Sequence, residues 1–277
     1  MTFDPGQLGR SKADLAEALG ALRRRAGRTQ VWLARRCNMS QTKLSNIETG
    51  RITPGLVDVE LILKALGTPR ETAAQMTALA RLAHTEWQGK RASWRRGVDK
   101  RQAELAGLEA KAVELRYFLP AMVTGLLATP AYMRAGLAHV PGDMSGTLAR
   151  KLERQAVLHD SGKRFTFLLT EQAVRWPVTS HESMAAQLDR LISLSHLPGV
   201  RIGVLPFVLP GVRGPMNTFT VYDERLVTVE TFTGRLVFRD VRDIADHLEI
   251  FSSYERIASF GDEARDLLRK WAGIYRS

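Results

Sequence analysis

Residues 30–50 constrain the fold of this 277-residue chain more than any other stretch. They contain two short segments with apolar residues at helical spacing, separated by Asn38, Met39 and Ser40. Asparagine tolerates the left-handed backbone of a tight turn better than most residues other than glycine. Serine accepts hydrogen bonds from the free amides at the start of a helix. The stretch therefore predicts two helices joined by a tight turn.

The second of these helices, expected at residues 41–49, has one apolar and one polar face. Leu44 and Ile47 face the preceding helix, where the small Ala34 permits close approach. Such a pair is the layout of a helix-turn-helix that reads bases in the major groove of double-stranded DNA. The alternative is an ordinary pair of core helices. In that case the match of so many positions to the helix-turn-helix pattern would be a coincidence. The residues expected to face outward are Gln41, Thr42, Lys43 and Asn46.

The flanking sequence extends the motif into a small helical domain. Residues 11–26 have leucines at helical spacing and end in three arginines, where cations suit the helix dipole. Gly27 ends this helix, and Thr29 is a suitable cap for the next one. A fourth helix is expected near residues 55–66. An all-α DNA-binding domain is therefore predicted over residues 11–69.

Positive charge is concentrated in the part of the chain that holds this motif. The formal net charge is +11. Residues 1–102 contain 19 Lys and Arg against 9 Asp and Glu, whereas the remaining 175 residues contain 21 against 20. A basic segment releases counterions from phosphate and so favours nucleic-acid binding. The charge distribution supports DNA as a partner independently of the motif.

Length and composition predict a second domain and exclude several classes. The chain far exceeds the roughly 60 residues of one such DNA-binding unit, and 44% apolar residues are enough for two cores. No apolar run is long enough to span a membrane and the start is no signal peptide, so a cytoplasmic, nucleoid-associated protein is expected. A single cysteine, Cys37, excludes an internal disulfide and a cysteine-cluster metal site. We expect it to be a packing residue rather than a redox switch.

The rest of the chain predicts a connector followed by a mixed α/β domain, which makes the overall class α+β. Residues 70–102 indicate a basic helical connector whose Trp87 and Trp94 either dock on the second domain, the favoured hypothesis, or contact DNA. Residues 103–277 alternate helical and strand patterns. Residues 104–116 are amphipathic and helical at first, and they lead into Tyr117-Phe118-Leu119, while residues 126–133 indicate a loop that enters a helix with Pro130 in its first turn. Strands are expected at 165–170, 200–205, 219–222, 227–230 and 236–238, and helices at 145–160, 181–195, 241–258 and 261–275.

The second domain shows no catalytic constellation, so no enzyme, cofactor or metal is expected. Its histidines are scattered, with no metal-ligand pair at helical spacing. Ser40 and Lys43 match a Ser-x-x-Lys nucleophile motif, but the helix-turn-helix already explains both. A set of polar residues could gather between a helix and a strand, and a salt-bridge network is favoured there over an active site. This set is Arg154, His159, Asp160, Glu171 and Arg175.

Residues 14–67 resemble the Cro/repressor class of helix-turn-helix domains, the XRE family, which implies a lambda repressor-like fold. In that family a glutamine at the position of Gln30 anchors a backbone phosphate. An arginine at the position of Arg23 pairs with a glutamate, here Glu48, and orients a phosphate contact. The family usually has glycine where this sequence has Asn38. The expected DNA-binding residues are Gln30, Ser40, Gln41, Thr42, Lys43, Asn46 and Arg51.

The remainder resembles actinobacterial regulators of the WhiJ-like kind, in which an XRE-type motif precedes a C-terminal domain of poorly defined function. The resemblance departs from the usual Pro-Gly-Leu-Leu-Gln-Thr at Thr124 and Ala128. It implies a domain that senses or binds something, and a small partner protein encoded by a neighbouring gene. The stretches that carry it are 123–132, 154–158, 168–175 and 200–206.

Two main hypotheses follow for the function. The first is a sequence-specific transcriptional regulator, acting as a repressor and as a homodimer on two half-sites, with residues 103–277 binding an effector or partner or forming the dimer. The second is an antitoxin-like protein that sequesters a small partner protein and regulates its own operon. An enzyme carried by a DNA-targeted protein stays open as a third class.

Overall fold

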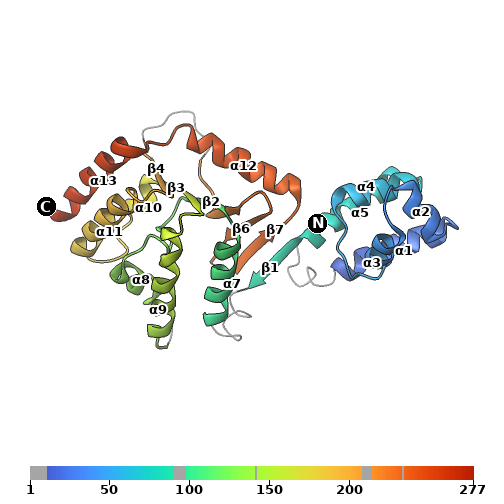
Figure 1. The fold of residues 1–277 in the computed structure, drawn as a ribbon, viewed down its shortest axis with the longest axis horizontal. Helices are drawn as coiled ribbons and strands as arrows, with labels where there is room; N and C mark the ends of the chain where they lie inside the picture. Colours follow the sequence, from blue (N-terminus) through green and yellow to red (C-terminus); the bar gives the residue numbers. More distant parts are fainter. Residues whose placement is uncertain (1–10, 90–97, 141, 208–213, 233) are drawn as a thin grey trace. The chain divides into compact units, whose positions relative to one another are not determined.

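The computed structural model describes residues 11–89, 98–140, 142–207, 214–232 and 234–277. By its internal contacts the chain divides into two compact units. The first comprises Met1–Trp87 with Leu236–Asp240, and the second Gln88–Arg235 with Val241–Ser277. A helical first unit and a mixed α/β second unit confirm the predicted α+β class (Figure 1).

The first unit is built from helices whose apolar faces share one core. Leu15 and Leu19 from the first helix meet Leu33 from the second and Leu44 and Ile47 from the third, and all five are fully buried. Since each helix is amphipathic and short, its stability comes mainly from this shared core. The helices are α1 (Ser11–Arg25), α2 (Gln30–Arg36), α3 (Gln41–Glu48), α4 (Leu56–Ala65) and α5 (Arg70–His84).

The local signals around the motif are confirmed. Thr29 caps α2 by accepting a hydrogen bond from the Trp32 amide at 3.2 Å, and Ser40 caps α3 by accepting from the Lys43 amide at 3.1 Å. Asn38 has a φ of 52°, in the left-handed region that the turn requires. These caps and the turn fix where α3 begins.

The segment 70–102 differs from the predicted helical connector. Helix α5 packs against α1 and α4, and its Met76, Ala80 and Ala83 are buried in the core of the first unit. The apolar stripe of α5 thus closes the core of the first unit. The chain then forms strand β1 (Thr85–Gly89), and the predicted roles of Trp87 and Trp94 concern side chains outside the described residues.

The second unit contains a mixed sheet flanked by helices. Five consecutive strands of this sheet lie in the order β6-β5-β2-β3-β4, with β2, β3 and β4 parallel and β5 antiparallel to both of its neighbours. The strands are β2 (Glu114–Leu119), β3 (Arg164–Thr170), β4 (Val200–Leu205), β5 (Phe219–Tyr222) and β6 (Leu226–Glu230), and β7 (Gly234–Phe238) contributes residues to both units.

The helices of the second unit cover both faces of this sheet. Helix α13 packs against β4, and α12 packs against β5 and β6, whereas α7 and α9 lie on the opposite side in Figure 1. Cover on both faces explains why β3 is buried at every position from Phe165 to Thr170 rather than at alternate ones. The helices are α7 (Val98–Lys111), α8 (Pro130–Leu137), α9 (Ser145–Arg154), α10 (Glu171–Arg175), α11 (His181–Leu194), α12 (Val241–Glu255) and α13 (Gly261–Arg276), and a 3₁₀ turn, Gln155–His159, follows α9.

The polar residues expected to form one network lie in separate places. Arg154 forms a bidentate ion pair with the buried Glu109 at 2.8 and 2.9 Å, and Arg175 pairs with Glu171. His159 and Asp160 are exposed. The salt-bridge prediction is therefore confirmed for Glu171 and Arg175, whereas Arg154 pairs with Glu109 of α7, which lies outside the expected set.

The packing of β3 against the start of β4 yields a stability prediction. A Cβ atom added to Gly199 would lie 2.7 Å from the Lys163 backbone carbonyl oxygen. We expect Gly199→Ala to lower the free energy of unfolding by about 1–3 kcal/mol, because a backbone atom cannot rotate away. Denaturant unfolding of the full chain measures this, with Gly107→Ala as the matched control. Gly107 lies in α7 with open space around it, so that change should stabilise by about 0.5–1 kcal/mol. Equal effects of the two changes would contradict the packing argument.

Candidate nucleic-acid interface

Helix α3 presents a polar face because its apolar face is fixed in the core. Leu44 and Ile47 are fully buried, so the opposite side of the helix is turned outward. Thr42 is exposed, and Asn46, one turn later, is half-buried. Gln41 is exposed at the first position of the helix, beside this face. The side chains expected to read bases are therefore on the accessible side of α3.

Ser45 also belongs to this outward face. It was not among the expected DNA-binding residues, because a small polar residue does not by itself indicate a DNA contact. It lies three residues after Thr42, on the same side of the helix, and it is half-buried. Helical spacing counted from the buried Leu44 and Ile47 would have found it. A small hydroxyl there can approach a base edge or a phosphate closely.

A carboxylate holds the first three helices together behind this face. Glu48 of α3 accepts two hydrogen bonds from the Arg23 guanidinium of α1, at 2.6 and 2.8 Å, and a third from Gln30 Nε2 of α2, at 2.8 Å. Arg23 also donates to the Arg28 carbonyl at 2.7 Å. The expected pairing of Arg23 with Glu48 is therefore present. The contact is bidentate and charge-assisted, and such contacts are stronger than hydrogen bonds between neutral groups.

The electrostatics of this cluster favour its charged form. Burial alone would raise the pKa of the Glu48 carboxyl, but hydrogen bonds from Arg23 and Gln30 and the charges of Arg23 and Arg24 together lower it below its ordinary value. The Glu48 hydrogen bonds raise the pKa of Arg23. Glu48 is thus ionised at neutral pH, and in this form it positions α3.

Gln30 makes a hydrogen bond within the protein in addition to the phosphate contact expected of it. Its side-chain amide carries two N–H donors, and one of them is directed at Glu48. The other donor stays available to a phosphate oxygen next to the start of α2. The structure therefore makes Gln30 a link between the helix cluster and the surface where the DNA backbone is expected.

Lys43 is paired within the protein. Its Nζ atom lies 2.8 Å from Asp58 Oδ1 of α4, and the side chain is 42% exposed. Asp58 Oδ2 also accepts a hydrogen bond from the Gly55 amide at 3.3 Å, which caps α4. To contact DNA, Lys43 has to share or exchange this carboxylate. No feature of the sequence near Lys43 indicated Asp58, because the two residues meet only in the folded domain.

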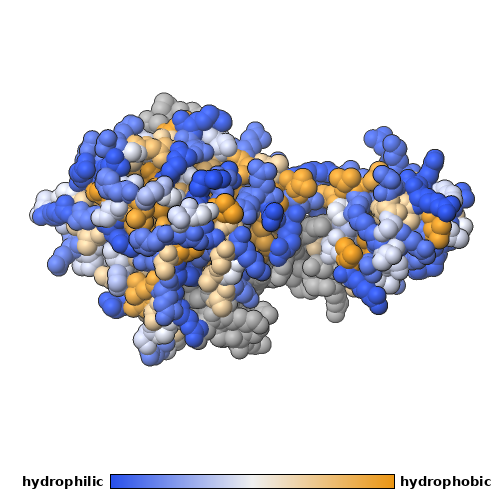
Figure 2. Space-filling view, viewed as in Figure 1, coloured by the Kyte–Doolittle hydropathy of each residue, from blue (hydrophilic) through white to orange (hydrophobic). Residues whose placement is uncertain are grey.

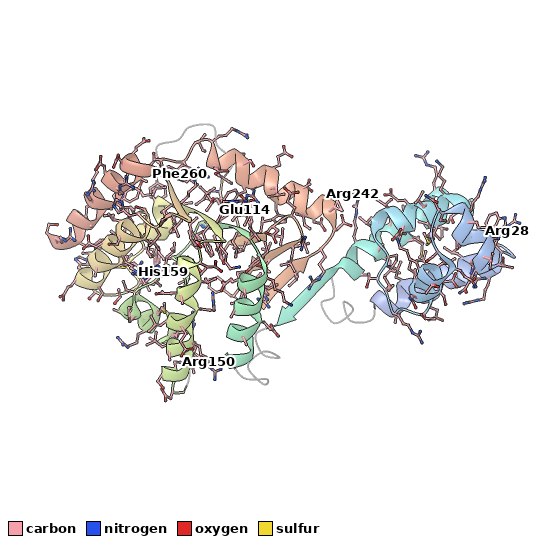
Figure 3. The ribbon with its side chains drawn as sticks, in the orientation of Figure 1. Arg28, Glu114, Arg150, His159, Arg242 and Phe260 are labelled. Atoms are coloured by element: carbon pink, nitrogen blue, oxygen red, sulfur yellow. The ribbon has the colours of Figure 1, made fainter. Side chains whose placement is uncertain are left out.

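Exposed arginines surround the motif. Arg51, which follows α3, is exposed and makes no ion pair with any other residue that the structure describes. The Arg28 guanidinium lies 4.5 Å from the centre of the Trp32 ring, at the surface of the first unit (Figure 3). Hydrophilic side chains cover much of the visible face of this unit (Figure 2). Further exposed arginines are Arg24, Arg25, Arg35 and Arg36.

Cys37 lies at the end of α2 and is buried in the core of the first unit. Burial, with a smaller contribution from the charge of Asp58, raises the pKa of its thiol. A thiol with a raised pKa and little exposure reacts slowly with oxidants. These properties support a packing role for Cys37.

Comparison with known protein families also finds two parts in the chain. Residues 102–270 match a family described as "Domain of unknown function (DUF5753)", and residues 14–76 match a family described as "Helix-turn-helix domain". No curated protein matches the sequence. Within the described residues, no helix is long and apolar enough to cross a membrane, and no three His, Cys, Asp or Glu side chains converge on a metal position.

Two solved structures show limited similarity. One is a phospholipase D family member, Nuc from Salmonella typhimurium, with a TM-score of 0.33 and 8% identity over 58% of this chain and 90% of that one. The other is TrmBL2, an archaeal chromatin protein with a novel mode of DNA binding, with a TM-score of 0.33 and 12% identity over 73% of this chain and 64% of that one. Neither score supports a functional argument.

The Glu48 cluster predicts strong coupling between two substitutions. Because Arg23 and Glu48 contact each other directly, Arg23→Ala and Glu48→Ala should each lower the stability of the first unit by roughly 2–4 kcal/mol, and the double variant by clearly less than their sum. Hydrogen exchange of the α1–α3 amides in the full chain measures each free energy. Additive losses would show that the pair is energetically unimportant.

The same cluster predicts a pH dependence. The pKa of Glu48 is lowered from 4.5 on folding, so its stabilising effect is complete above about pH 4.5 and is lost as the pH falls through the lower folded-state value. The stability advantage of the wild type over Glu48→Gln should therefore shrink below about pH 4.5. Hydrogen exchange at several pH values measures this, with the exposed Glu17→Gln as a control. An advantage that is constant across this range would contradict the assignment.

Proposed function

Since the chain belongs to the DUF5753 family and carries a helix-turn-helix domain, we propose that it is a sequence-specific DNA-binding transcriptional regulator that acts as a repressor. The observation that carries the proposal is the outward polar face of α3, held in place by the Glu48 cluster. A helix presented in this way fits the major groove, where its first residues meet base edges.

In this proposal the residues of the first unit have distinct roles. Gln41, Thr42 and Asn46 read base edges, since Gln and Asn can form bidentate hydrogen bonds with adenine. Arg51 and the second amide proton of Gln30 contact phosphates, which fix the position of the domain on the duplex but carry no sequence information. Lys43 leaves its ion pair with Asp58 in order to contact DNA, and Ser40 contributes mainly by capping α3.

We further propose that the protein binds as a homodimer to two half-sites. A single recognition helix contacts only a few base pairs, so useful specificity requires two helices about one helical turn, roughly 34 Å, apart. The second unit would then hold the dimer contact, the effector site or both. An antitoxin-like protein that sequesters a small partner is the competing proposal.

Gel-shift titration tests DNA reading directly. DNA upstream of the protein's own gene is compared with a shuffled fragment at near-physiological salt, using the wild type and Gln41→Ala. We expect tight wild-type binding to the native fragment and a loss of about 1–3 kcal/mol in Gln41→Ala, confined to the native fragment. Weak and equal wild-type binding to both fragments would favour the sequestration proposal.

Arg51→Ala is the matched variant for backbone contact. It should weaken binding to native and shuffled DNA alike and lower the slope of log affinity against log salt by about one, because one phosphate contact is lost. The slope is measured by titration at several salt concentrations. A loss confined to the native fragment would instead make Arg51 a base reader.

A further inference from the structure

A pocket of about 760 Å³ opens in the second unit at one edge of the sheet. The three parallel strands β2, β3 and β4 all end at this edge, and the residues that close or follow them, Pro120, Thr170 and Leu205, line the pocket. In open α/β sheets the space outside the carboxyl ends of parallel strands is where ligands commonly bind. The volume falls within the range of small-molecule sites.

The base of the pocket is held by hydrogen bonds between the strand ends. The Thr170 hydroxyl, at the end of β3, donates to the Pro120 carbonyl that follows β2, at 2.8 Å. The carboxylate of the buried Glu171 accepts from the Phe207 amide, after β4, at 3.0 Å. These two contacts join all three strand exits, so the cavity is formed without a ligand.

The lining is apolar and aromatic, and it contains no charged side chain among the described residues. Large side chains are left in solvent around it: Phe232 is 97% exposed, Met216 is 78% and Phe207 is 65%. Apolar surface of this kind gathered around a hollow indicates a binding site rather than ordinary surface. Among the lining residues that the structure describes, a charged ligand would find no ionic partner to compensate for its lost hydration.

A polar side chain among the described lining residues can orient a ligand. Gln172, at the start of α10, lines the pocket, and its side chain makes no hydrogen bond to any other residue that the structure describes. An amide can both donate and accept, so it can pair with a carbonyl, hydroxyl or amide. Trp176 beside it offers an aromatic face for stacking.

From these observations we propose that the second unit binds an uncharged, largely apolar small molecule with a planar ring and one hydrogen-bonding group. Its site is the pocket at the carboxyl ends of β2, β3 and β4. As an effector site this pocket rests on the proposed regulator function. As a binding site it can be tested without DNA.

Nile red, a neutral planar dye with a carbonyl group, is a suitable probe. Titration of the full chain should give saturable fluorescence enhancement with one dye per chain. The double variant Phe207→Ser/Met216→Ser should weaken binding at least about tenfold, since two exposed apolar contacts are removed. Val241→Ser/Ile274→Ser is the matched control, because both residues are exposed and apolar in the same unit but lie outside the pocket. It should change the affinity less than about twofold.

Unsaturable binding, or equal weakening by both double variants, would overturn the proposal. Circular dichroism establishes that each variant is folded, and sedimentation velocity establishes its oligomeric state. If the pocket variant alone dissociated a wild-type dimer, the pocket would be a contact between copies, and the small-molecule proposal would fail. Gln41→Ala, which should lose specific DNA binding, should still bind the dye. The DNA-binding proposal and the small-molecule proposal can therefore fail independently of each other.

Discussion

The geometry of the first unit depends on one carboxylate. Glu48 accepts hydrogen bonds from α1 and α2 while it belongs to α3, and it is the polar contact that fixes all three helices at once. The apolar core sets how closely these helices pack, but leucine and isoleucine contacts are not directional. Hydrogen bonds are directional, so the Glu48 cluster determines the angle at which α3 presents its polar face.

Local chemistry made much of the fold predictable. Thr29 and Ser40 mark helix starts because their hydroxyls cap free amides, and Asn38 marks the turn because it accepts a left-handed backbone. Thr129 and Pro130 likewise mark the start of α8. The strands of the second unit were predictable because they are short stretches rich in β-branched and aromatic residues.

Contacts between residues distant in sequence were not predictable from the residues themselves, and the Arg23–Glu48 pair was expected only because of the family resemblance. The Lys43–Asp58 and Arg154–Glu109 pairs each join two helices, and nothing in the neighbourhood of one residue indicates its partner. The pocket has the same origin, because Pro120, Thr170 and Leu205 meet only once β2, β3 and β4 are in register. The apolar stripe of α5 was visible in the sequence, but the core that it joins was not.

The position of α5 determines where this protein can be divided. Its Met76, Ala80 and Ala83 complete the core that also contains Leu15 and Leu19, so the smallest fragment with an intact interior extends through His84. A fragment cut at residue 69 would keep every side chain assigned to DNA, yet would leave the inner sides of α1 and α4 in water. The surface proposed to read DNA therefore ends earlier in the sequence than the folded core that supports it.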